Sequence, residues 1–275
     1  MADILSYKLL ENVYIPALGL GTWQVTGKDC VQAVKHAIAV GYRHIDTAFR
    51  YDNHREVAQA IKESNIPRDE LFVTTKIWSD QFSTSEVYQA AQLALAELGV
   101  EYLDLVLMHW PNKNIPVDET LQALHHLRES GVIRAYGVSN FTIRHLQDAL
   151  DAGYEVAVNQ VEFHPSFNQK ELKSFCDEHC ILITAYSPIA QGEDLKLPIV
   201  QELSEKYQRS PSQVILNWIL QSGMAVVPRS ANPSHIEDNL QTLEWNLDLK
   251  DLELMNNLDS GNRIIMPEYH EFDYK

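Results

Sequence analysis

The chain has 275 residues, of which 45% are hydrophobic and 22% charged, and its net charge is −16. This composition predicts a folded globule, and the negative charge disfavours binding to nucleic acid or to an anionic membrane. The sequence contains no run of about 18 apolar residues that would predict a membrane span. Its first residues lack the basic-then-apolar order of a secretory signal. Because the cysteines are few and scattered (Cys30, Cys176 and Cys180), we expect free thiols and a cytoplasmic protein.

Short apolar segments typical of buried strands alternate along the chain with longer segments of helical periodicity. Residues 6–16 first predict a hairpin that caps one end of the fold. The predicted strands then cover 17–21, 43–46, 71–78, 102–110, 133–140, 155–163, 181–188 and 224–230. The predicted helices cover 31–40, 55–64, 86–98, 119–130, 143–152, 170–180 and 198–222, the last broken near Ser210-Pro211. Strict alternation predicts a parallel sheet covered by helices, and eight units in this length predict an α/β fold, a closed (β/α)₈ TIM barrel in one domain over 1–275.

The alternative architecture is an open doubly wound sheet of the Rossmann type. Its GxGxxG fingerprint would follow the first strand, where this chain has only Gly19-Leu20-Gly21 before Thr22. The third glycine is missing, and no linker rich in Pro, Gly or Ser divides the chain. One barrel is therefore the simpler interpretation.

Polar side chains stand at or near the carboxyl ends of seven predicted strands. They are Asp46, Lys76 before Trp78, His109 before Trp110, Ser139 with Asn140, Gln160, Tyr186 with Ser187, and Arg229 with Ser230. One such residue alone would most often hydrogen-bond to a neighbouring loop. In a (β/α)₈ barrel all these ends meet at one face, where the fold builds its sites, so seven together predict a single cavity.

Four side chains near this cavity fit the reduction of a carbonyl group. Lys76 on a buried strand needs a charged partner, and Asp46 is the only carboxylate at the end of a neighbouring strand. Tyr51 follows five residues after Asp46, where an adjacent ammonium would lower its pKa from about 10 and favour its use as a general acid. His109 can hydrogen-bond the same carbonyl oxygen while hydride arrives from a cofactor. These residue types together predict a carbonyl reductase.

Five sequence blocks, in their order and spacing, resemble the aldo-keto reductases. They are GYRHIDTAFRYDN (41–53), TTKIW (74–78), LVLMHWP (105–111), GVSNF (137–141) and VPRSANPSHIEDN (227–239). This resemblance covers nearly the whole chain and implies a (β/α)₈ barrel with a catalytic tetrad of Asp46, Tyr51, Lys76 and His109, Tyr51 being the proton donor. It also implies an oxidoreductase that binds NADPH without a Rossmann motif, which accounts for the missing third glycine.

The resemblance further implies a cofactor site across the carboxyl face of the barrel. Its expected residues are Gly21, Thr22, Asp46, Ser139, Asn140, Gln160, Tyr186, Ser187, Ile189, Arg229, Ser230, His235, Asp238 and Asn239. Asn140 and Gln160, with the neighbouring serine, would hold the nicotinamide carboxamide, and Tyr186 would stack on the ring. Arg229 matches the position that grips the 2′-phosphate, a role suited to a guanidinium. His235 replaces the usual arginine, so use of both NADPH and NADH remains an alternative.

Aromatic residues predict the walls of a substrate pocket. Trp23, Phe49, Trp78 and Trp110 could be core residues, but they follow strand ends or lie in the Tyr51 loop, and with His109 they are expected to contact substrate. The segment after Asp259 is short and resembles bacterial reductases of small polar dicarbonyls, such as diketo-gluconate and methylglyoxal reductases. We therefore predict a monomeric NADPH-dependent aldehyde or ketone reductase without a metal site. The alternative is a barrel that serves as a binding subunit, as potassium-channel β subunits do, although the intact tetrad argues against it.

Overall fold

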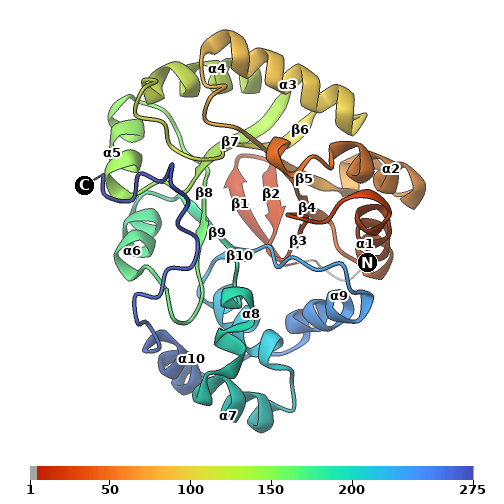
Figure 1. The fold of residues 1–275 in the computed structure, drawn as a ribbon, viewed down its shortest axis with the longest axis vertical. Coiled ribbons are helices and arrows are strands. Elements are labelled where there is room, and N and C mark those ends of the chain that lie inside the picture. Colours follow the sequence, from red (N-terminus) through yellow and green to blue (C-terminus); the bar gives the residue numbers. More distant parts are fainter. Residues whose placement is uncertain (1–4, 275) are drawn as a thin grey trace.

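The computed structural model describes residues 5–274, which form a parallel sheet surrounded by helices (Figure 1). The strands are β3 (Leu20–Gly21), β4 (His44–Asp46), β5 (Phe72–Ile77), β6 (Leu103–Met108), β7 (Ile133–Ser139), β8 (Val158–Glu162), β9 (Leu182–Tyr186) and β10 (Ala225–Val226), paired in chain order. Parallel bridges from Leu18 to Val226 and from Gly21 to Arg229 join the first strand to the last. The sheet closes on itself, so the predicted eight-stranded barrel is confirmed.

The last strand is much shorter than the predicted segment 224–230, because Pro228 has no backbone N–H to continue the ladder. Its carbonyl oxygen still accepts a hydrogen bond from the backbone of Gly21 at 3.0 Å. A Cβ atom on Gly21 would lie only 2.8 Å from the carbonyl oxygen of Val227, so this glycine permits the close approach that closes the barrel.

Helices pack around the sheet and present apolar faces to it. They are α1 (Gly27–Val40), α2 (His54–Ser64), α3 (Thr84–Leu98), α4 (Val117–Glu129), α5 (Ile143–Asp151), α6 (Lys170–Glu178), α7 (Pro198–Tyr207), α8 (Pro211–Gln221), α9 (Pro233–Leu240) and α10 (Leu249–Asn256). The predicted break at Ser210-Pro211 is confirmed, since the Ser210 side chain caps α8 by accepting from the backbone of Gln213 at 3.2 Å. Within residues 5–274 no helix is long and apolar enough to cross a membrane.

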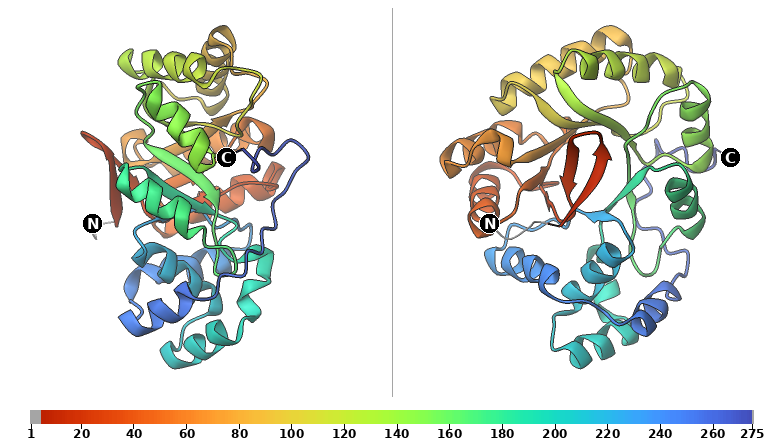
Figure 2. Two further views of the ribbon diagram at one scale, coloured as in Figure 1. Left: turned by 90° about the vertical axis from the view of Figure 1, so that its left-hand side faces the viewer. Right: turned by 180° about the vertical axis from the view of Figure 1, so that it is seen from behind.

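The two ends of the barrel are covered differently (Figure 2). The predicted hairpin is confirmed as β1 (Ser6–Leu10) and β2 (Val13–Pro16), which lie over the amino ends of the strands. Val13 and Ile15 pack there with interior side chains such as Phe72, forming a second apolar core inside the barrel. The chain after α10 crosses the opposite, carboxyl end, where a short 3₁₀ turn η1 (Phe49–Tyr51) also lies. Only this second end is left to build a site.

Candidate active site

The carboxyl ends of β4, β5 and β6 bring the four predicted catalytic side chains together. The Nζ atom of Lys76 lies 2.6 Å from Oδ1 of Asp46 and 3.2 Å from the hydroxyl oxygen of Tyr51. The ring of His109 meets the ring of Tyr51 edge to face, with centroids 5.8 Å apart. Lys76 is 1% exposed and Asp46 is 3% exposed, so the ion pair lies out of water, where each charge depends on the other.

Two residues that the sequence analysis did not identify hold the loop of Tyr51 in place. The backbone oxygen of Thr47 accepts a hydrogen bond from Lys76 at 2.9 Å. Asn53 accepts from the Thr47 hydroxyl at 2.6 Å and donates to the backbone oxygen of Thr22 at 2.9 Å. The sequence offered one indication of their role, because both lie in the block GYRHIDTAFRYDN (41–53) that contains Tyr51. These bonds fix the turn that carries the phenol over the end of β4.

Burial sets the protonation states of the phenol and the imidazole. Burial and, to a lesser extent, the charge of Asp46 raise the pKa of Tyr51 well above 10, opposite to the lowering expected from the sequence. The loss of hydration outweighs an ammonium that Asp46 already neutralises. Burial, followed by the positive charges of Lys76 and Arg50, holds the pKa of His109 well below 6.5. A protonated phenol and a neutral imidazole can each donate a hydrogen bond to a carbonyl oxygen.

His109 also has a polar atom that lacks a partner. Its Nδ1 atom is buried and has no hydrogen bond to any residue that the structure describes. Its backbone oxygen accepts from Nδ2 of Asn140 at 3.0 Å, which fixes the end of β6. Because buried polar atoms are almost always hydrogen-bonded, this imidazole is typical of a site that receives a ligand.

A group of amide and hydroxyl side chains from β7, β8 and β9 adjoins the tetrad. The Ser139 hydroxyl donates to the backbone oxygen of Gln160 at 2.8 Å, and the Tyr186 hydroxyl donates to Oδ1 of Asn140 at 2.7 Å. Nε2 of Gln160 donates to Oδ2 of Asp46 at 2.7 Å, which links the two groups. Oε1 of Gln160 accepts no hydrogen bond within the described part of the chain. These donors and acceptors, beside a tyrosine ring, fit the carboxamide of a nicotinamide.

The other expected cofactor residues extend from β3 and β9 towards α9. Thr22 is tied to the tetrad, because its hydroxyl donates to the backbone oxygen of Asp46 at 3.0 Å. Arg229 and His235 are exposed and free to meet an anion, whereas Ser230 is buried. Two further expected cofactor residues, Ser187 and Ile189, follow β9 and are half-buried.

Two of the expected cofactor residues, Asp238 and Asn239, form hydrogen bonds with the start of α8. The Asp238 carboxylate accepts from the Ser210 hydroxyl at 2.5 Å and from Nε2 of Gln213 at 2.7 Å. Oδ1 of Asn239 accepts from the Ser212 hydroxyl at 2.9 Å. These bonds join α9 to the first turn of α8, so both side chains contribute to packing whatever they contact in a ligand.

The structure places the expected aromatic wall residues at different depths. Trp78 packs edge-on against His109, with ring centroids 5.2 Å apart, and Trp110 is buried. Tyr269 of the C-terminal segment contacts both indoles, at 5.1 and 5.3 Å. Half-buried Phe49 packs on His54, and Trp23 is 41% exposed. The sequence analysis missed Tyr269, whose ring adds a third aromatic side chain to the expected pair Trp78 and Trp110.

A buried cluster after β8 holds the C-terminal segment across the barrel. The Glu162 carboxylate accepts from the backbone N–H groups of Ile264 at 2.7 Å and Ile265 at 2.9 Å. His164 lies between two carboxylates, with Nε2 2.9 Å from Glu162 and Nδ1 3.0 Å from Asp194. All three charged side chains are buried. A glutamate two positions after Gln160 in a buried strand was the signal available in the sequence.

The pH dependence of stability tests this anchor. Burial alone lowers the pKa of His164, but the hydrogen bonds to Asp194 and then Glu162 more than offset it, and the pKa lies above 6.5. The bound proton therefore stabilises the fold fully below about pH 6.5, and this contribution is lost as pH rises through the folded-state pKa. In urea titrations from about pH 6 to about pH 9, we expect wild type to lose more free energy of unfolding than His164→Asn. An identical pH dependence in both proteins, with exposed His126→Asn as control, would contradict this assignment.

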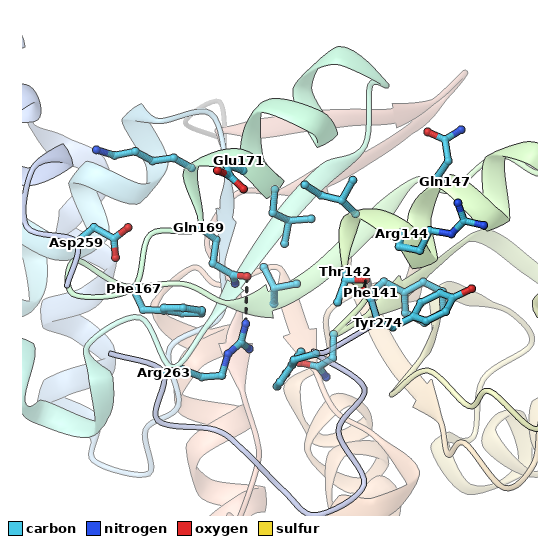
Figure 3. Close-up of a pocket in the computed structure, with 16 residues that line it drawn as sticks. Phe141, Thr142, Arg144, Gln147, Phe167, Gln169, Glu171, Asp259, Arg263 and Tyr274 are labelled. Carbon is cyan, nitrogen blue, oxygen red and sulfur yellow. Dashed lines mark hydrogen bonds between the residues drawn. The ribbon is translucent and has the colours of Figure 1, made fainter. Parts of the chain in front are cut away.

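A cavity of about 900 Å³ lies beside the tetrad, between α5, α6 and the C-terminal segment (Figure 3). Arg263 points across it and donates to Oε1 of Gln169 at 3.4 Å. Of the described residues that line it, Asn140 alone belongs to the expected site. The cavity therefore adjoins the candidate active site and does not contain it.

The chain is similar in sequence and in fold to proteins described as reductases, in agreement with the geometry of the site. A sequence model described as the aldo/keto reductase family matches residues 17–260. A 9,11-endoperoxide prostaglandin H2 reductase from Trypanosoma cruzi (strain CL Brener) is 41% identical over 261 residues, which cover 93% of this chain and 92% of that protein. A glyoxal reductase from Bacillus subtilis (strain 168) is 40% identical over 259 residues, 94% of each. The crystal structure of MGS-M4, an aldo-keto reductase enzyme from a Medee basin deep-sea metagenome library, has a TM-score of 0.92 at 35% identity, covering 95% of this chain and 97% of that one.

Proposed function

Because this chain belongs to the aldo/keto reductase family, we propose that it is an NADPH-dependent oxidoreductase that reduces aldehydes or ketones to alcohols, with Tyr51 as the proton donor. The observation that carries this proposal is the tetrad, in which the hydroxyl of half-buried Tyr51 lies 3.2 Å from Nζ of buried Lys76. Membership of the family supports carbonyl reduction with a nicotinamide cofactor. The choice of NADPH and the role of Tyr51 are our inference from the site.

The tetrad supplies the proton and the polarisation that carbonyl reduction requires. A bound reduced nicotinamide would provide the hydride that reaches the carbonyl carbon. As the carbonyl oxygen gains negative charge, Tyr51 gives it the hydroxyl proton, and the Lys76 ammonium stabilises the phenolate left behind. His109 donates a second hydrogen bond to the same oxygen and orients it. Asp46 holds Lys76 in place and opposes the lowering of its pKa that burial causes.

The substrates that fit this pocket are small polar carbonyl or dicarbonyl compounds. Support comes from the similar glyoxal reductase and from the aromatic rings of Trp78, Trp110 and Tyr269, which pack together beside His109. The direct test is cofactor oxidation with a panel of glyoxals, sugar keto acids and aromatic aldehydes, using both nicotinamides. Cofactor binding without turnover of any member would instead favour a binding subunit.

Arg229→Ala tests the preference for NADPH. Arg229 is exposed at the end of the cofactor track, and a guanidinium–phosphate contact contributes about 10- to 100-fold in affinity. In fluorescence titrations the variant should therefore bind NADPH at least about 10-fold more weakly, while the Kd for NADH changes little. Equal weakening of both nicotinamides would contradict the assignment of the 2′-phosphate. His235→Ala is the companion variant, with a smaller loss expected because its imidazole supplies less charge.

We also propose that the protein works as a cytoplasmic monomer. The three cysteines are free, two of them buried and Cys180 exposed, which is typical of a reducing compartment. Gel filtration at a position near 31.4 kDa tests the monomer.

A further inference from the structure

Arg50 lies between Phe49 and the proposed proton donor Tyr51 in η1, and its side chain packs on the ring of Trp78. The central carbon of its guanidinium lies 4.5 Å from the centre of the Trp78 ring. That ring is also in edge contact with the rings of His109 and Tyr269. Arg50 is thus a cation close to the tetrad, separated from His109 by the ring of Trp78.

This guanidinium has no acidic partner among residues 5–274, although the chain has 38 acidic and only 22 basic residues. Other arginines of the protein do bind carboxylates. Arg68 and Arg134 share Asp104, and Arg128 pairs with Glu155. Among residues 5–274, the guanidinium of Arg50 packs on the face of the Trp78 indole and forms no ion pair. Its N–H donors are therefore free to bind a ligand.

The charge of Arg50 affects the pKa values of His109 and Tyr269. It contributes, after burial and Lys76, to the low pKa of His109. It also opposes the rise in the pKa of Tyr269 that burial causes. An anionic group beside the Arg50 guanidinium would be attracted to it, whereas a neutral group of the same size would gain little.

We propose that Arg50 binds a carboxylate on the substrate, so that the site selects oxo acids, carbonyl compounds that carry a carboxylate, over neutral carbonyl compounds of the same size. The planar guanidinium packed over the Trp78 ring can present two parallel N–H groups to the two oxygens of a carboxylate. The reacting carbonyl then lies deeper, at Tyr51 and His109. This inference rests on the proposed function, because it names the substrate class of the same site.

A matched pair of substrates tests the proposal. 4-Carboxybenzaldehyde and 4-formylbenzamide have nearly the same shape and differ by one negative charge. We expect Arg50→Gln to lower the ratio of kcat/KM for the acid to kcat/KM for the amide by about 10- to 100-fold. Arg50→Lys should give an intermediate ratio, since it keeps the charge but loses the paired donors. Arg55→Gln removes the same charge from a side chain that is 81% exposed on α2, and should leave the ratio as in wild type.

The outcomes separate this inference from the proposed function. If wild type reduces both aldehydes and Arg50→Gln changes both kcat/KM values in parallel, Arg50 only supports Trp78 and the selection of oxo acids is wrong. If wild type reduces no member of the carbonyl panel, these two aldehydes included, the proposed function fails, and this inference with it. If it reduces other members of the panel but not these two, inhibition of that turnover by benzoate and benzamide decides. If Arg50→Gln does not fold, inhibition of wild type decides: benzoate should inhibit more strongly than benzamide, and equal inhibition overturns the proposal.

Discussion

Tyr51→Phe is expected to lower kcat/KM for carbonyl reduction by about 10³-fold, within the range usual for loss of a general acid, while NADPH binds almost as well as to wild type. The substitution removes one hydroxyl group and keeps the ring that packs against His109. The Lys76–Asp46 pair at 2.6 Å does not depend on that hydroxyl, so the fold and the cofactor track should be preserved.

Steady-state kinetics and a fluorescence titration of NADPH check this expectation together. Tyr136→Phe is the control, since Tyr136 is also a buried tyrosine but packs outside the barrel against His125 of α4. It should turn over substrate like wild type. Turnover by Tyr51→Phe near the wild-type rate would remove Tyr51 from the role of proton donor. A large loss of NADPH affinity would show that the phenol instead shapes the cofactor site.

Lys76→Met is expected to cost about 3–5 kcal/mol in the free energy of unfolding, besides abolishing turnover. It leaves the Asp46 carboxylate 3% exposed, with Nε2 of Gln160 at 2.7 Å as its remaining side-chain donor. An unpaired charge at such a site loses the ammonium that offset its desolvation. Urea unfolding monitored by circular dichroism measures the loss.

The double variant Asp46→Asn/Lys76→Met separates stability from catalysis. Removing the stranded charge should restore much of the stability, because both charges are then gone, while turnover stays lost. A double variant no more stable than Lys76→Met would show that the cost comes from packing rather than from the charge. Recovery of activity in the double variant would contradict the role given to Lys76.

The alternation of strands and helices was sufficient to predict the barrel, because each apolar run had to be buried on both faces. The family resemblance is confirmed by the match over residues 17–260. The break at Ser210-Pro211 was predictable because a serine cap and a proline in the first turn are local signals. The convergence of Asp46, Lys76 and His109 followed from topology alone, since parallel strands end at one face of the barrel.

Features that depend on distant contacts or on burial could not be predicted in this way. The bonds from Ile264 and Ile265 to Glu162 join positions more than a hundred residues apart, and no local pattern marks them. The contacts of Tyr269 with Trp78 and Trp110 could not be predicted for the same reason, because they also join distant positions. The pKa of Tyr51 was predicted in the wrong direction because its sign depends on the degree of burial, which the sequence does not give.

The attachment of the C-terminal segment uses main-chain N–H groups at positions 264 and 265, and every amino acid except proline provides one. The side chains at these two positions can therefore change, naturally or by design, without loss of the hydrogen bonds that hold the C-terminal segment with Tyr269. The backbone oxygen of Ser166, which accepts from the N–H groups of Ser260 at 3.1 Å and Asn262 at 3.0 Å, holds the same segment in the same way, so main-chain bonds at four positions fix its path over the carboxyl end of the barrel.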